Sequence, residues 1–197
     1  VFCTGNILIA EPEDMQEYEN CTEIDGTLTI ASPQLLHFSF PYLTRIYGDL
    51  IIDGTGVLLT LEGLSALNEV NGDIRITNNL VLNELKGLEG ISIVAGSLQI
   101  TDNPNLIRLG GLANVMLVAG GSLEVARNAS LQDLDGLSSI HTIAGGLILS
   151  GNPMINHIEG LKQVQSIGEM VSPGVIQITN NTELENLDGL QAVTAVR

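Results

Sequence analysis

Few residues of this chain have the type and spacing that chemistry requires. Asp49 and Asp73 lie 24 residues apart, and Arg75 follows Asp73 by two positions. If the chain repeats with that period, the two carboxylates lie on neighbouring strands with the arginine beside them. Such a pair could raise the pKa of one carboxyl group or hold a cation. The histidines of the chain share no spacing typical of a metal site or a catalytic triad.

The elements that would position these residues follow from a glycine repeat. A glycine repeatedly opens a short run of alternating apolar residues, such as GDIRI or GSLQI, and consecutive openings are 22 to 29 residues apart. A repeat this short cannot bury its own apolar face, so each copy must stack on its neighbours. The sequence therefore predicts an all-β solenoid, a parallel β-helix or leucine-rich-repeat-like coil with about seven turns of about 24 residues. The opening glycines are Gly26, Gly48, Gly72, Gly96, Gly121, Gly145 and Gly174.

The second half of each repeat carries apolar residues at spacings of three, as in Leu82, Leu85 and Leu88. This spacing does not fit one long strand, in which side chains alternate with a period of two. We therefore expect one true strand in each turn, followed by compact corners that direct aliphatic side chains inward. Aromatic residues make up only 3% of the chain and none follows Tyr47, so Leu, Ile and Val must fill the repeat interior.

An asparagine lies five residues after the first apolar position of most of the predicted strands. An inward asparagine has two donors and an acceptor, so stacked copies could satisfy backbone groups that a tight corner leaves unpaired. The alternative is a set of exposed turn asparagines, because turns favour this residue. The positions are Asn79, Asn103, Asn128, Asn152 and Asn181.

The chain is expected to be one domain, residues 1–197, in which residues 1–25 form an N-terminal cap and residues 26–197 the repeats. Pro12 suits the first turn of a short helix, and the acidic residues around it suit the positive end of that helix. Cys3 and Cys21 flank the cap, which indicates a disulfide and an oxidising compartment. Two free buried thiols are the alternative.

Three segments, CTGNILI, ENCTEIDGTLTI and FSFPYLTRIYGDLII, resemble the opening of the receptor L domain. This is the ligand-binding solenoid of the insulin and epidermal-growth-factor receptors. The GLxxL repeats are similar to the more regular versions in fungal cell-wall proteins and microbial surface proteins. The resemblance covers nearly the whole chain, and it implies a right-handed coil of parallel strands, an extracellular or cell-surface setting and a binding role.

Outward-facing strand residues predict three columns along the main sheet. We expect the middle column to bind a ligand, with Ile51 and Ile148 as its best contact residues because they are apolar positions in an otherwise polar column. Ordinary exposed aliphatics, or a binding site in the loop around Gly168 to Pro173, are the alternatives. The middle column holds Thr29, Ile51, Arg75, Gln99, Glu124, Ile148 and Gln177. The first column holds Thr27, Asp49, Asp73, Ser97, Ser122, Gly146 and Val175, and the third holds Ala31, Asp53, Thr77, Thr101, Ala126, Ser150 and Thr179.

Composition limits the possible partners. The chain has 7 basic and 23 acidic residues and a formal net charge of -16, so its surface repels phosphate backbones and anionic lipid headgroups. We therefore expect neither nucleic-acid binding nor direct membrane insertion by this segment. It has no secretory or anchor signal and ends at Arg197, where the next strand should begin, so we expect it to be part of a longer protein.

We expect an extracellular recognition or adhesion module that binds a protein or cell-surface ligand, without catalysis, metal or cofactor, and with self-association as a further possibility. An ice-binding or surface-lattice solenoid is the alternative, because Thr77, Thr101 and Thr179 share a column. A less favoured alternative is a polysaccharide-active β-helix enzyme.

That enzyme would use Asp49, Asp73 and Arg75, but the chain has no aromatic sugar-stacking platform beyond Tyr47. Three glycosylation sequons occur in the sequence. We expect modification at Asn20 or Asn180 and not at Asn128, which lies in the asparagine column.

Overall fold

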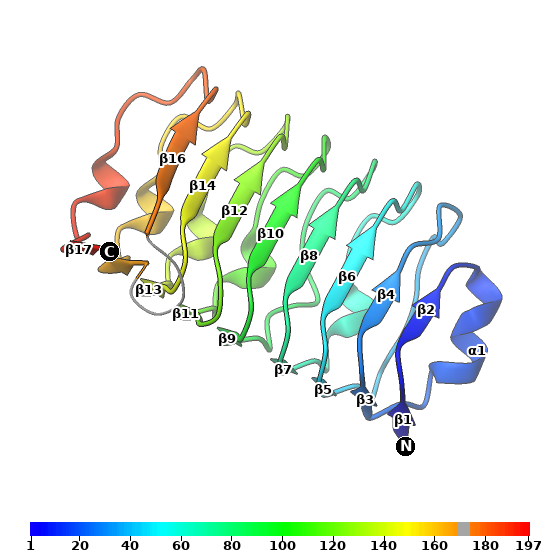
Figure 1. Ribbon diagram of the computed structural model, residues 1–197. Helices are drawn as coiled ribbons and strands as arrows, with labels where there is room; N and C mark the ends of the chain where they lie inside the picture. Colours follow the sequence, from blue (N-terminus) through cyan, green and yellow to red (C-terminus); the bar gives the residue numbers. More distant parts are fainter. Residues whose placement is uncertain (169–173) are drawn as a thin grey trace.

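The computed structural model describes residues 1–168 and 174–197 as a parallel β solenoid. Figure 1 shows its long strands side by side in chain order, from the N-terminal to the C-terminal end of the stack. Hydrogen bonds join each strand to the corresponding strand of the previous and the next turn, so the sheets grow along the solenoid axis. The predicted all-β solenoid is confirmed.

The larger strands form one parallel sheet, called here the long-strand sheet. A predicted opening glycine lies shortly before each of its strands except β2, which belongs to the segment expected to be cap. Their apolar residues alternate inward, as in Leu98 and Ile100, which are both fully buried. The strands are β2 Ile7–Ile9, β4 Leu28–Ile30, β6 Leu50–Asp53, β8 Ile74–Thr77, β10 Leu98–Thr101, β12 Leu123–Ala126, β14 Leu147–Ser150 and β16 Ile176–Thr179.

A second parallel sheet, called here the short-strand sheet, corrects the expectation of one true strand per turn. Most of its strands have only two residues, so each is too short to show the alternation that identifies a strand in a sequence. They are β1 Phe2–Thr4, β3 Glu23–Asp25, β5 Arg45–Ile46, β7 Glu69–Val70, β9 Ile93–Val94, β11 Leu117–Val118, β13 Thr142–Ile143, β15 Ser166–Ile167 and β17 Ala195–Val196.

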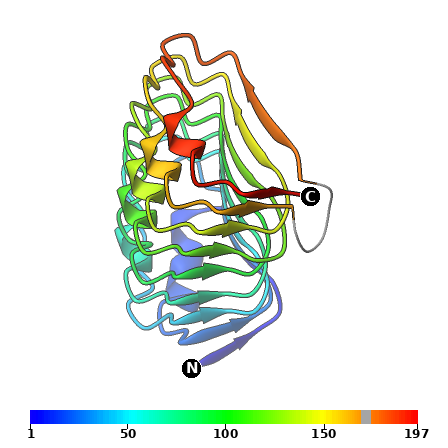
Figure 2. The same ribbon diagram turned by 90° about the vertical axis from the view of Figure 1, so that its left-hand side faces the viewer.

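Short 3₁₀ helices stack along another side of the solenoid, as Figure 2 shows from the C-terminal end. They are η2 Glu62–Leu64, η3 Gly110–Leu112, η4 Asp135–Leu137, η5 Glu159–Leu161 and η6 Asp188–Leu190. A glycine at the second position of each helix lies against the previous turn. At Gly111, for example, a Cβ atom would collide with the carbonyl oxygen of Leu85. The glycine column therefore sets how closely successive turns approach.

The asparagine column faces inward, as predicted. The Asn103 side-chain amide donates to the carbonyl oxygen of Ile76 at 2.9 Å, and its backbone N–H donates to the Asn128 side-chain oxygen at 3.1 Å. The same pattern links Asn128 to Asn152. Thr55 occupies the equivalent corner one turn before Asn79. Each of these side chains is fully buried, and the asparagines supply the hydrogen bonds that the corner backbone needs.

The N-terminal segment contains both helical and strand structure. Helix η1 (Pro12–Asp14) continues into α1 (Met15–Tyr18) beyond β2 at the end of the stack (Figure 1). Asp14 fixes the start of η1, because its side-chain oxygen accepts hydrogen bonds from the backbone N–H groups of Ala10 and Glu11, both at 2.9 Å. The predicted disulfide is present: it joins Cys3 in β1 to Cys21, which lies just before β3.

Candidate functional site

The residues predicted to bind a ligand form one continuous column on the outer face of the long-strand sheet. Strand register pairs each of them with the equivalent residue of the next turn, and their neighbours along each strand are mostly buried. The structure therefore brings together Thr29, Ile51, Arg75, Gln99, Glu124, Ile148 and Gln177. They form the surface called here the middle column.

Leu8 extends the middle column by one strand, and sequence reasoning missed it. It pairs with Thr29 in the β2–β4 register, and 54% of its surface is exposed. The run ILI at residues 7–9 carries the same alternation as the predicted strands. Gly5 precedes Ile7 by two positions, as Gly26 precedes Leu28, so the sequence signal for this strand was present although residues 1–25 were predicted to be cap.

Arg75 at the centre of this face is held by the two aspartates that were singled out for chemistry. Its guanidinium group pairs with Asp49 at 2.8 Å and with Asp73. The other side-chain oxygen of each aspartate accepts a backbone hydrogen bond from the next turn: Asp49 from the Asp73 N–H at 2.8 Å, and Asp73 from the Ser97 N–H at 2.7 Å. The cluster does come together, but every carboxylate oxygen in it already has a partner.

These two aspartates belong to a ladder that follows the first column as far as Gly146, since Gly146 and Val175 have no side-chain oxygen to continue it. In each turn a side-chain oxygen accepts the backbone N–H of the equivalent residue in the following turn, as Ser122 does from Gly146 at 2.9 Å. The sequence signal is a run of short oxygen-bearing side chains at one repeat position, which can reach nearby backbone groups. The successive acceptors are Asn6, Thr27, Asp49, Asp73, Ser97 and Ser122. The side chains of this ladder therefore stabilise the stacking of successive turns.

The third column is less exposed than expected. Thr101 is only 7% exposed, and the hydroxyl of Thr77 donates to the Asp53 carboxylate at 2.5 Å. The hydroxyls of Ser150 and Thr179 lie 3.0 Å apart and share a hydrogen bond. These side chains therefore do not present the regular array of free threonine hydroxyls that an ice-binding surface would use.

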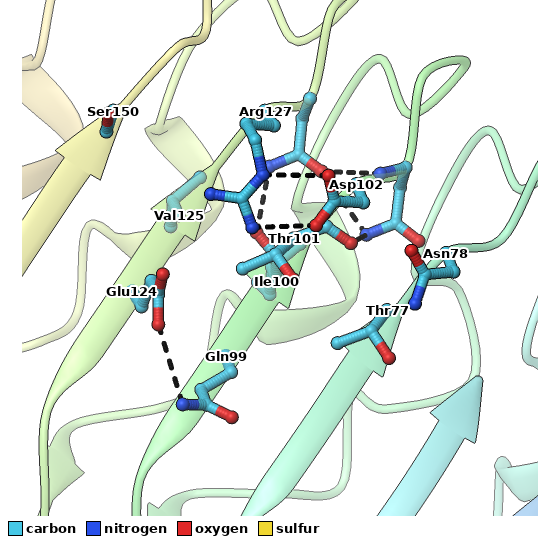
Figure 3. Close-up of polar contacts among 12 residues, drawn as sticks. Thr77, Asn78, Gln99, Ile100, Thr101, Asp102, Glu124, Val125, Arg127 and Ser150 are labelled. Carbon is cyan, nitrogen blue, oxygen red and sulfur yellow. Dashed lines mark hydrogen bonds and ion pairs between the residues drawn. The ribbon is translucent and has the colours of Figure 1, made fainter. Parts of the chain in front are cut away.

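An ion pair lies beside the third column, at the corners that follow β10 and β12. Figure 3 shows the Arg127 guanidinium against the Asp102 carboxylate, with nitrogen-to-oxygen distances of 2.8 and 2.7 Å. The hydrogen bonds from Arg127 lower the pKa of Asp102, and the same contact raises the pKa of Arg127. Both residues have positive φ, 58° for Asp102 and 56° for Arg127. This pairing holds two turns together at an unfavourable backbone geometry.

A further polar cluster lies on the short-strand sheet, where the sequence predicted no strand. Arg45 pairs with Glu69 at 2.7 Å and lies 5.5 Å from the centre of the Tyr47 ring. The Tyr47 hydroxyl donates to Glu23 at 2.9 Å, and the ring edge meets Phe2. The strand register of the short-strand sheet aligns Glu23, Arg45 and Glu69. Because the sequence predicted no strands there, it could not predict this cluster.

Within residues 1–168 and 174–197, no three His, Cys, Asp or Glu side chains gather closely enough to hold a metal ion. No helix in the same part of the chain is sufficiently long and apolar to span a bilayer. The alternative binding loop around Gly168 to Pro173 lies, from residue 169 to 173, outside the described residues.

Comparison with protein-family models, with curated proteins and with solved structures finds no match to this chain.

Proposed function

We propose that the chain is an extracellular recognition or adhesion module of the receptor L-domain type. It binds a protein or cell-surface ligand through the long-strand sheet. The observation that carries this proposal is the contrast between adjacent columns of that sheet. From Thr27 to Ser122 the side chains of the first column are committed to backbone hydrogen bonds, whereas several in the middle column have no side-chain hydrogen bond to the described part of the scaffold. These are Leu8, Thr29, Ile51, Ile148 and Gln177.

The free middle-column side chains lie at both ends of the face, with charged residues between them. Leu8, Thr29 and Ile51 occupy neighbouring strands on the N-terminal side of Arg75, and Ile148 and Gln177 are neighbours on the C-terminal side. Apolar contacts surrounded by ordered polar groups are the usual composition of a recognition surface. A flat ligand surface could engage both ends at once, which would make the two isoleucines cooperate in binding.

The disulfide between Cys3 and Cys21 supports the extracellular setting, because such bonds persist mainly in oxidising compartments. The net charge of -16 argues against a nucleic-acid partner. We further infer that α1 closes the N-terminal end of the stack, since Met15 and Tyr18 pack against the core there. A Met15→Asp variant should then bind more of a dye that reports exposed apolar surface; unchanged dye binding would contradict the capping role.

The recognition proposal is tested by applying the protein to an array of recombinant extracellular protein domains and glycans. Array members that bind should lose about tenfold or more in affinity when Ile51 and Ile148 are both changed to Asp, because the charge must be desolvated at the contact. Leu59→Asp is the matched control, since Leu59 is 49% exposed and lies outside this sheet. Circular dichroism and thermal unfolding should show that both variants stay folded.

Equal ligand affinity of the double variant and the control would show that the binding site is not on the sheet face. The array experiment also separates the other candidate functions. An ice-binding protein would bind no array member and would show thermal hysteresis, and a polysaccharide-active enzyme would release sugar from the glycans it binds.

A further inference from the structure

Two adjoining pockets form a groove between the N-terminal helices and the chain that follows β4. The first pocket has a volume of about 340 Å³ and lies between Pro12 and Met15 on one side and Leu36 and Phe38 on the other. The second has a volume of about 220 Å³ and is lined by Asn20 and Tyr42, among others. Glu19 and Ser39 line both pockets. Together these residues form what is called here the N-terminal groove.

The groove exists because the turn between β4 and β5 departs from the repeat. Residues 32–44 read SPQLLHFSFPYLT in place of the regular leucine and glycine columns. Leu35, Phe38 and Phe40 turn inward and are almost completely buried. Leu36 and Tyr42 are left outward, 63% and 58% exposed. The groove thus has an apolar floor and exposed apolar side chains at its edge, which no other described residue covers.

The carboxylates around the groove outnumber its basic groups, and His37 is the basic side chain in its lining. Helices η1 and α1 and their flanks carry Glu11, Glu13, Asp14, Glu17 and Glu19, and the chain has no lysine or arginine before Arg45. Partial desolvation and the negative charges of Glu17 and Asp14 raise the pKa of the Tyr18 phenol, which is consistent with a negative potential here. Acidic side chains on an open protein surface are simply solvated by water. Here they border an apolar groove, so their negative charge favours the approach of a basic ligand over an acidic one.

We propose that the N-terminal groove binds a basic peptide segment with one apolar anchor residue, supplied by a partner protein. The aliphatic or aromatic anchor seats between Met15, Leu36 and Phe38, and a neighbouring lysine or arginine pairs with Glu19 at the junction of the two pockets. Apolar anchors in pockets with charged partners at the rim are the usual source of affinity and orientation in such contacts.

This site is separate from the proposed sheet-face site, because no middle-column residue lines either pocket. The chain could therefore hold two partners, or two parts of one partner, at the same time. Asn20 lines the second pocket, so a glycan attached to its side chain would cover that end of the groove.

A library of random short peptides displayed on phage tests the proposal directly. The disulfide-bonded protein, made without glycosylation, is used for selection at low salt. We expect enriched peptides to combine Leu, Ile, Met, Phe or Trp with adjacent Lys or Arg. A synthetic enriched peptide should bind with an affinity that falls as salt is added, because charge pairing contributes. Enrichment of acidic peptides, or of no peptide at all, would overturn the proposal.

Matched variants then locate the bound peptide. Leu36→Asp should weaken binding about tenfold or more, and Glu19→Lys should weaken it and remove most of its salt dependence. Leu80→Asp and Glu185→Lys are the controls, since both residues are exposed and lie outside the groove. If the Leu36→Asp variant does not fold, Leu36→Gln replaces it as the test of the anchor contact. Binding that Leu36 and Glu19 variants leave unchanged would place the peptide elsewhere, and loss of binding in Ile148→Asp would assign it to the sheet face.

Discussion

The side-chain oxygen of Asn103 accepts two hydrogen bonds from Asn79, one from the backbone N–H at 3.1 Å and one from the side-chain amide at 2.9 Å. Asn103 also donates to the carbonyl oxygens of Ile76 and Thr101. One buried side chain therefore satisfies groups in its own turn and in the turn before it.

Asn103→Ala should lower the free energy of unfolding by about 1–3 kcal/mol or more, because several buried backbone groups lose their partner. Asn71→Ala is the matched control. Asn71 is exposed, and its side chain makes no hydrogen bond to the described residues, so its change should be within about 0.5 kcal/mol. Urea unfolding monitored by circular dichroism measures both. Equal stability of the two variants would show that the ladder contributes nothing to the fold.

Adjacent glycines in η3 give a second matched pair. Gly111→Ala should destabilise the protein by about 1–3 kcal/mol, because the added Cβ collides with the backbone of Leu85 in the turn before. Gly110→Ala should be neutral or stabilising by up to about 1 kcal/mol, since nothing lies within 4 Å of its added Cβ. Thermal unfolding of the two variants should therefore differ in direction; similar losses in both would mean that turn spacing is not set by the glycine column.

The ion pair of Asp102 with Arg127 predicts a pH-dependent effect. Arg127→Gly relieves a positive φ that costs about 1 kcal/mol for a residue with a side chain. It also removes an exposed pair worth at most about 1 kcal/mol after solvent screening. Because the folded-state pKa of Asp102 is lowered, the pair contributes above the unfolded-state pKa and is lost as the pH falls through the folded-state value.

The Arg127→Gly variant should therefore match the parent protein near neutral pH and exceed it in stability in acid. Urea unfolding across this pH range measures the difference. Asp102→Asn is the control, because it removes the titrating group and should make the effect of Arg127→Gly independent of pH. A variant that is less stable than the parent in acid would contradict the backbone argument.

Secreted eukaryotic material should carry glycan at Asn20 or Asn180 and none at Asn128. Asn128 is fully buried, and its amide donates to the Ile100 carbonyl at 2.8 Å, so it is inaccessible once the chain has folded. Asn20 and Asn180 are exposed. Glycopeptide mapping tests all three positions in one sample, and an occupied Asn128 would show that the register, or the inward ladder itself, is wrong.

The parts of the fold that could be predicted are those whose residues recur once in each turn of the sequence repeat. The glycine before each long strand and the asparagine after it recur at a nearly fixed interval, so stacking them places Asn103 beside Asn128 with no knowledge of coordinates. The middle column from Thr29 to Gln177 follows from the same interval and from the alternation of side chains in a strand.

What could not be predicted depends on structure that does not repeat in the sequence. The two-residue strands such as Ile93–Val94 are defined by their neighbours, because a dipeptide carries no periodic signal of its own. The role of Asp49 as a backbone acceptor depends on how its side chain meets the Asp73 N–H in the next turn. The repeat interval alone does not give that contact. The N-terminal groove depends on how one irregular turn packs against a helix, and local patterns do not encode that packing.

The equivalence of the asparagine corners has a consequence for how such a chain can change its length. Asn79 presents to Asn103 nearly the same groups that Asn103 presents to Asn128. Removing one complete turn by recombination would join two surfaces that already fit, whereas removing half a turn would misalign every column. Gene duplication or loss in units of one turn can therefore move whatever lies at the two ends of the stack closer together or farther apart without redesigning the interior.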